Sequence, residues 1–346
     1  RSTLFPYTTL FRSPYSSGDA VYSTSAGEIP LDDTFLDTRY ALGVGWTQPI
    51  GRLYEGTAGI TFSTEYDYTH VGANLSLSRD FNERNTTVAA GIAWSQDDLD
   101  PVGGAPLPLS QMLDVGDLSN RTGSRSKDVI DVLFGVTQVL GRTAVLRLNY
   151  SYSDSSGYLN DPYKFLSVVD PITGDTILRT PAPGQAGPGG VYRFESRPET
   201  RTKQAVYAEL KKDLHGRTLS AAYRYMTDDW DVNSHTLDAR LRWPLGAATY
   251  LEPHVRYYTQ TSAEFYRLAL VNGEPMPQFV AADYRLADFD ATTIGVKLGR
   301  ELSGNREWSV RLEYYAQSAN VAAGMLIGNQ ANRYMEIGRA SCRERV

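Results

Sequence analysis

An acidic run offers the most obvious metal-binding chemistry in the sequence. Asp229, Asp231 and Asn233 have a D-x-D-x-N spacing, which can present oxygen ligands to calcium. A calcium-binding loop also needs a glycine at its sixth position and a glutamate at its twelfth, but Ser234 and Arg240 occupy these positions. A solvated acidic turn explains the run better than a metal site does, and nothing else in the sequence calls for a cofactor.

Histidine is the second residue type that could do chemistry, as a general base. His235 lies next to the acidic run, where a hydrolase on the outer rim of a membrane barrel would place a histidine beside aspartates. The alternation of side chains puts His235 on the same side as Leu237, whereas His254 lies on the opposite, charged side. His70 and His215 have no metal-ligand spacing. We therefore expect no enzyme, because no nucleophile, base and orienting group meet in any one run.

Charged side chains recur at every second position of several segments, which puts them on one side of extended strands. Inside a barrel, such side chains would either pair and tie neighbouring strands together or, where unpaired, set an ion preference. Both interpretations are open. The residues expected to line this inner face are Arg147, Lys203, Glu209, Arg224, Asp238, Arg240, Arg242, Glu252, His254, Arg256, Lys297, Arg311 and Glu313.

The segments that must position these residues alternate apolar and polar side chains with period two, which is typical of strands. Leu237, Ala239 and Leu241 share one side of such a segment, and Asp238 and Arg240 share the other. About twelve segments match this pattern. In a water-soluble sandwich the apolar side would form the core, whereas in a membrane barrel it would meet lipid.

Tryptophan and tyrosine gather near the ends of the apolar sides. In an outer-membrane barrel these rings would form girdles at the two membrane interfaces, whereas in a sandwich they would be core aromatics. We expect the girdle arrangement. The residues concerned are Trp46, Trp94, Tyr150, Tyr152, Tyr223, Tyr225, Trp243, Tyr257 and Trp308.

The connections favour a barrel. Those after odd-numbered strands are all short, whereas those after even-numbered strands include long ones at 96–126, 153–201 and 262–288. Short turns on one rim and longer loops on the other are typical of outer-membrane barrels, and a Greek-key sandwich has no reason to keep this parity. We expect an all-β fold, an antiparallel transmembrane β-barrel of outer-membrane type, with about twelve strands present of about 14–16. Pro253 would weaken the tenth strand or mark a β-bulge.

Both ends of the chain, 1–13 and 336–346, resemble translated sequencing-library adapter and are set aside. We then expect an N-terminal segment at 14–33 and one barrel domain at 34–335, with any signal peptide outside this sequence. Setting the ends aside removes Cys342, the only cysteine, and reduces the basic residues from 34 to 29 and the acidic ones from 40 to 38. The net charge moves from −6 to −9, which makes nucleic acid a poor partner. No apolar run reaches the roughly 18 residues of a membrane-spanning helix.

Three runs carry a resemblance to a known family. They are TEYDYTHVGANLSLSRDFNERNTT at 64–87, YRYMTDDWDVNSHTLDARLRWP at 223–244 and YLEPHVRYYTQTSAEFY at 250–266. These runs resemble an uncharacterised family of bacterial proteins, classed as a domain of unknown function and expected to form outer-membrane β-barrels. The resemblance spans nearly all of 33–334 and implies fold and outer-membrane location. It implies no activity, because the family has none assigned.

The function favoured by these features is a porin-like passive channel for small solutes or ions, with outer-membrane lipid as the surrounding partner. The charged inner face would set its selectivity, and the three long loops would fold inward as constrictions. A different class of function is a non-conducting scaffold or surface receptor that binds a partner through those loops. A barrel-type surface hydrolase is a third and weaker alternative.

Overall fold

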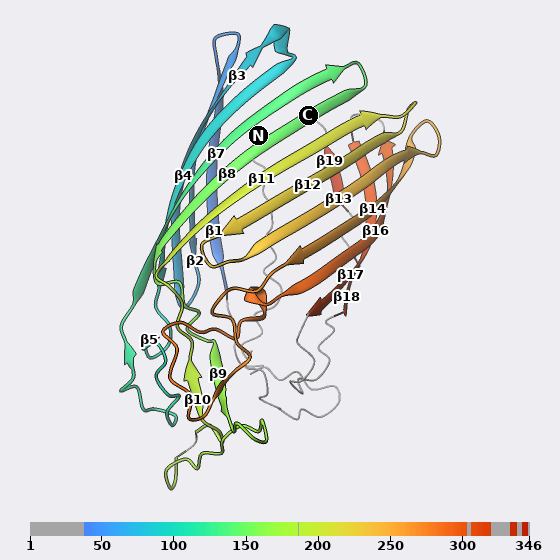
Figure 1. The fold of residues 1–346 in the computed structure, drawn as a ribbon. Coiled ribbons are helices and arrows are strands. Elements are labelled where there is room, and N and C mark those ends of the chain that lie inside the picture. Colours follow the sequence, from blue (N-terminus) through green and yellow to red (C-terminus); the bar gives the residue numbers. More distant parts are fainter. Residues whose placement is uncertain (1–37, 186, 303–305, 320–332, 338–340, 345–346) are drawn as a thin grey trace.

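The computed structural model describes residues 38–185, 187–302, 306–319, 333–337 and 341–344. Twelve long strands follow one another, along the chain and in space, as a single curved antiparallel sheet (Figure 1). Two short strands, β18 (Arg333–Ile337) and β19 (Ser341–Glu344), pair with the last long strand. The long strands are β1 (Tyr40–Ile50), β2 (Tyr54–Thr64), β3 (Tyr68–Phe81), β4 (Thr86–Leu99), β7 (Arg125–Gly141), β8 (Ala144–Gly157), β11 (Thr200–Asp213), β12 (Thr218–Asp228), β13 (Asn233–Pro244), β14 (Thr249–Gln260), β16 (Phe289–Leu302) and β17 (Arg306–Ala319).

A nearly unbroken register gives this sheet one apolar face. Leu237 on β13, for example, lies opposite Tyr223 on β12 and Tyr257 on β14. Because successive side chains point to opposite faces, a slip of one residue would move every following apolar side chain to the other face. Among the twelve long strands of the described chain, the register shifts at one place, between Val139 and Gly141, at the short-turn end of β7.

The apolar face is also the exposed face. Ile60, Leu75 and Ile294 expose 62%, 61% and 57% of their surface, whereas His254 on the polar face exposes 7%. Side chains spread on the convex side of a curved sheet and crowd on the concave side, so the polar face is the concave one. A sandwich would bury the apolar face beneath a second sheet. In the described chain the two smaller sheets lie within the long connections instead (Figure 1), so the barrel prediction is confirmed and the sandwich alternative is wrong.

The expected alternation of short and long connections is present. At one end of the sheet, 51–53, 82–85, 142–143 and 214–217 are short links, and the long connections 100–124, 158–199 and 261–288 all lie at the other end. Residues 303–305, which connect the last two long strands, lie outside the described residues. Within the described ranges, no helix is long and apolar enough to cross a membrane.

Pro253 creates no β-bulge, so that alternative is wrong, but it does weaken the pairing of its strand with β13. β14 runs continuously from 249 to 260, and Pro253 stays in register with Val296 on β16. On the other side, the pairs Arg240–His254 and Trp243–Leu251 keep one register, but the two positions between them are unpaired. Proline has no N–H to donate, so it leaves a gap in this ladder without shifting it.

The three long connections pack on one another as a loop lobe, defined as residues 100–124, 158–199 and 261–288. It contains short strands and a 3₁₀ segment, and two apolar clusters centred on Trp230 and Leu166 lie within it and at its junction with the sheet. The segment 181–190 is held near its ends, because Ala182 N–H donates to Asp114 and Arg179 N–H donates to the Gly189 carbonyl. The short elements are β5 (Ala105–Pro106), β6 (Arg121–Thr122), β9 (Phe165–Val169), β10 (Tyr192–Phe194), β15 (Ala269–Val271) and η2 (Tyr284–Leu286).

A buried ionic cluster joins two of these connections. Arg197 donates to Glu195 at 2.9 Å and, across the lobe, to Asp283 at 2.9 Å; Arg285 also donates to Asp283. Burial alone would raise the pKa of Asp283, but the hydrogen bonds and charge of Arg285, together with the charge of Arg197, hold it well below its usual range. Asp283 is therefore ionised and links 158–199 to 261–288.

Replacing Asp283 with asparagine should loosen the loop lobe without disturbing the sheet. The change leaves two arginines without their shared carboxylate, at a local cost on the order of 3 kcal/mol. Hydrogen exchange followed by mass spectrometry should show faster exchange in 158–199 and 261–288 and unchanged exchange in the strands. Asp175→Asn, at an exposed position of the same lobe, is the matched control. Equal exchange in both variants would contradict a linking role for Asp283.

Candidate functional site

The concave face brings together every residue expected on the inner side. Because neighbouring strands pair in a continuous register, the alternation of side chains places all of them on this face of β8 to β17. We call this set the charged strip: Arg147, Lys203, Glu209, Arg224, Asp238, Arg240, Arg242, Glu252, His254, Arg256, Lys297, Arg311 and Glu313. It contains eight cations and four carboxylates in addition to the histidine. The strip is therefore locally basic, although the whole chain carries a net charge of −6.

Ion pairs within and between strands involve most of the strip. Arg147 on β8 lies 3.5 Å from Glu209 on β11, which also accepts from Ser220 on β12 at 2.9 Å. At the short-turn end, Arg242 donates to Glu301 at 2.9 Å. These pairs are partly exposed, and each contributes little free energy to stability alone. Arg147–Glu209 joins adjacent strands, whereas Arg242–Glu301 reaches across β14, so side chains tie the strands together in addition to the backbone.

His254 is the best-connected member of the strip. Its Nε2 lies 2.9 Å from Asp238 on β13, and its Nδ1 lies 2.8 Å from Glu313 on β17. Glu313 belongs to a strand two positions away, so its side chain must cross β16. The crossing point is Gly295, where an added Cβ would lie 2.5 Å from Glu313 Cγ. The missing side chain of Gly295 thus allows three strands to share one buried histidine.

A second glycine on β16 serves the same purpose. A Cβ on Gly299 would lie 2.2 Å from the ring of Tyr250, which crosses β16 and donates through its hydroxyl to Glu307 on β17. Lys297 also donates to Glu307, at 3.1 Å. The two glycines of β16 therefore leave room on the concave face for side chains of β14 and β17 to meet across this strand.

Three cations of the strip have no ion pair among the described residues: Lys203, which is half-buried, and Arg224 on β12 and Arg256 on β14, which are exposed. Asp238 lies opposite Arg256 in the register, but its carboxylate is taken up by His254 and by Arg240 at 3.3 Å. The two exposed guanidinium groups remain available to an anion on the concave side.

The acidic run forms a turn in which the side-chain oxygens of Asp229 and Asn233 already have donors. Asp229 accepts from the Thr202 N–H at 3.0 Å, and Asn233 Oδ1 accepts from the Tyr225 hydroxyl at 2.9 Å. Asp231 adopts a positive φ of 65°, as expected in a tight turn. Within the described part of the chain, no group of three or more histidine, cysteine or acidic side chains has the arrangement of a metal site.

The aromatic residues expected at the interfaces and His235 all lie on the apolar face. Register parity puts each of the nine rings there, and Trp46, at 63%, is the most exposed of them. His235 accepts or donates a hydrogen bond of 2.7 Å with the Tyr223 hydroxyl on the same face. It is therefore separated from the charged strip by the thickness of the sheet.

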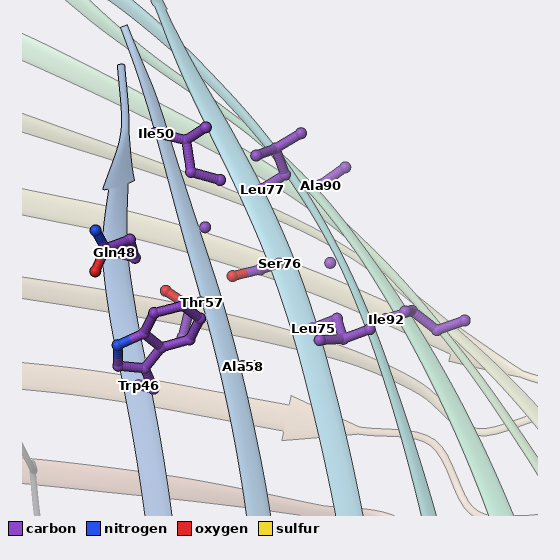
Figure 2. A pocket seen from close by; sticks show the side chains of 12 residues that line it. Trp46, Gln48, Ile50, Thr57, Ala58, Leu75, Ser76, Leu77, Ala90 and Ile92 are labelled. Carbon is purple, nitrogen blue, oxygen red and sulfur yellow. The ribbon is translucent and has the colours of Figure 1, made fainter. Parts of the chain in front are cut away.

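A shallow hollow opens on the apolar face of β1–β4, away from the charged strip. Figure 2 shows its wall, to which Trp46, Ile50, Leu75, Leu77 and Ile92 contribute side chains. It holds no charged residue, so it has no group suited to acid–base or metal chemistry. The chemistry of this sheet belongs to its concave face.

The sequence did not predict one group of interacting polar residues on the concave face. Thr61 on β2, His70 on β3 and Asp97 on β4 are joined by hydrogen bonds of 3.1 and 2.6 Å, and Lys127 on β7 lies 2.7 Å from Asp97. These residues are spread over 67 positions of sequence, from 61 to 127, and no local spacing connects them. Aligning the three hairpins by register would have been the one available signal.

The strand order, the exposed apolar face and the polar concave face define an all-β, antiparallel barrel of the outer-membrane type. The chain belongs to the family described as "Protein of unknown function (DUF3570)", which it matches over residues 6–336. None of the curated proteins searched matches the chain.

Solved structures of similar fold include bacterial outer-membrane receptors. The ferric enterobactin receptor PfeA of Pseudomonas aeruginosa has a TM-score of 0.50 and 10% identity, over 82% of this chain and 43% of that one. The siderophore receptor PirA of Acinetobacter baumannii gives 0.48 and 8%, over 88% and 49%. The ferric-catecholate import receptor Fiu of E. coli gives 0.44 and 9%, over 83% and 57%. This chain thus spans about half the length of these receptors, and at such identities the likeness concerns the fold alone.

Replacing Gly295 with alanine should separate Glu313 from His254. The new methyl group would also lie 2.9 Å from the Leu312 carbonyl, so β16 and β17 must shift. We expect a loss of about 1–3 kcal/mol in the free energy of unfolding, as for other overpacked sites. Urea titration of the refolded protein in detergent measures it. Gly246→Ala, at a turn position with open space around it, should be neutral. Equal stability of the two variants would contradict the claim that Gly295 makes room for Glu313 to cross β16.

Proposed function

We propose that this protein lies in the bacterial outer membrane and forms a porin-like passive channel for small solutes or ions. The observation that carries the proposal is the inverted polarity of the sheet: apolar side chains are exposed outside, and a charged, partly open wall lines the inside. A wall of this kind suits water-filled passage, because it offers hydrogen-bonding groups along the path in place of a packed apolar core.

The proposed channel prefers anions. The carboxylates of the charged strip are held by cations or by His254, whereas Arg224 and Arg256 have no such partner among the described residues. Unpaired guanidinium groups raise the local concentration of anions, and charges that are already paired contribute little to this effect. The proposal thus rests on two particular side chains and not on the net charge of the chain.

A second candidate function is partner binding by the loop lobe. The lobe has its own apolar clusters and small sheet, and it still exposes Ile172, Leu178 and Val115 at 92%, 86% and 76%. Exposed apolar side chains on an ordered surface favour binding of another macromolecule. Deleting the tip 170–178 should abolish such binding and leave ion permeability unchanged.

Conductance across a planar lipid bilayer tests the channel. The purified protein should give discrete conductance steps, and a chloride gradient should give a reversal potential of anion-selective sign. Arg224→Gln with Arg256→Gln should lower the chloride-to-potassium permeability ratio by roughly twofold or more. Arg142→Gln with Arg217→Gln removes the same charge from the short turns and should have a smaller effect. A bilayer that remains sealed would rule out the channel, and equal ratios in both double variants would rule out the role of the two arginines.

A further inference from the structure

The hydrogen-bonded series Thr61–His70–Asp97 has the order of a hydroxyl nucleophile, a base and an orienting carboxylate. Thr61 Oγ1 lies 3.1 Å from His70 Nε2, and His70 Nδ1 lies 2.6 Å from Asp97. The Asp97 side chain is 6% exposed, and Lys127 lies 2.7 Å from its second oxygen. Both contacts are within the hydrogen-bond reach that activation of a hydroxyl requires.

The bonding pattern fixes the direction of the protons. An ionised carboxylate only accepts hydrogen bonds, so His70 donates through Nδ1–H to Asp97. The Nε2 atom of a neutral imidazole is then an acceptor, and the Thr61 hydroxyl must donate to it. This is the arrangement in which histidine can take the proton from an attacking hydroxyl.

Gly72 makes this meeting possible. It lies opposite Thr61 in the register and two residues beyond His70 on β3. A Cβ on Gly72 would lie 2.6 Å from Thr61 Oγ1 and 3.2 Å from His70 Nε2. The absence of a side chain therefore leaves room for the hydroxyl and the imidazole at one point of the concave face.

The site is open toward the concave side. Thr61 is exposed, and His70 keeps 25% of its side chain accessible. Asn74 lies on the same face, opposite Gly59, where a Cβ would be 2.8 Å from its Nδ2. That amide is a diagonal neighbour of Thr61 and can donate to a carbonyl oxygen held in front of the hydroxyl.

We propose that Thr61, His70 and Asp97 form a site that hydrolyses small carboxylic esters reaching the concave face. This activity is independent of the proposed channel. Thr61 Oγ1 forms a bond to the carbonyl carbon while His70 Nε2 takes the hydroxyl proton. The ester C–O bond then breaks, and His70 returns the proton to the leaving alcohol. Water attacks the acyl-threonine by the same route, which releases the carboxylic acid and restores the Thr61 hydroxyl.

Hydrolysis of p-nitrophenyl acetate by the purified protein in detergent tests this site. Thr61→Val keeps the shape but removes the hydroxyl, and it should lower kcat by at least about 100-fold. Thr61→Ser keeps the hydroxyl and should retain activity. Asp97→Asn should lower kcat with little change in KM, because Asp97 is a positioning residue that acts through His70. An acid-quenched mixture should contain protein heavier by one acetyl group, located on Thr61.

The matched control is Thr57→Val. Thr57 lies on the same face of β2 as Thr61, and its hydroxyl is bonded to Thr47 at 3.2 Å, outside the series. This variant should hydrolyse the ester at the unchanged rate. Far-ultraviolet circular dichroism of each variant checks that the sheet is intact. Equal hydrolysis by Thr61→Val and the unaltered protein, or no acetylation of Thr61 in folded protein, would overturn the proposal.

Discussion

The backbone register of the twelve long strands is the constraint on which the rest of this structure depends. Antiparallel pairing with period two lets each strand place apolar side chains on one face and polar side chains on the other. The register is carried across the sheet with one shift, at the end of β7, so the separate alternations add up to one apolar and one polar surface. Either surface would be lost if a central strand slipped by one residue.

Glycine is what turns the polar surface from isolated pairs into networks. Two glycines each leave room for two larger side chains to meet. At Gly295 these are His254 and Glu313, and at Gly72 they are His70 and Thr61. Hydrogen bonds in a crowded, partly buried place are worth more than those in open water, and an unmatched group there is costly. The same small residues thus account for the crossing of β16 and for the open space in front of the Thr61 hydroxyl.

The period-two pattern was sufficient to predict the strands, the two faces and the alternating connections, because it is a local property of the sequence. The ion pairs could be predicted only as a set, since parity names a face but not the partner that a long arginine side chain selects. The packing of the loop lobe could not be predicted from periodicity, because its apolar clusters join residues as distant in sequence as Leu166 and Val280. The Thr61–His70–Asp97 series could not be predicted for a similar reason, and the hydrolysis proposed for it departs from our expectation of no enzyme, which stays a prediction.

The central claim is that lipid, and not water, contacts the exposed apolar face, and spin-label accessibility tests it most directly. Spin labels placed singly at Leu75 and Ile294 of the protein in lipid vesicles should relax faster with oxygen, which dissolves in hydrocarbon. Labels at Ser76 and Thr293, on the concave face, should respond to a water-soluble nickel chelate instead. Labels at Leu75 and Ile294 that respond to the chelate, or to neither reagent, would contradict a lipid-facing barrel wall.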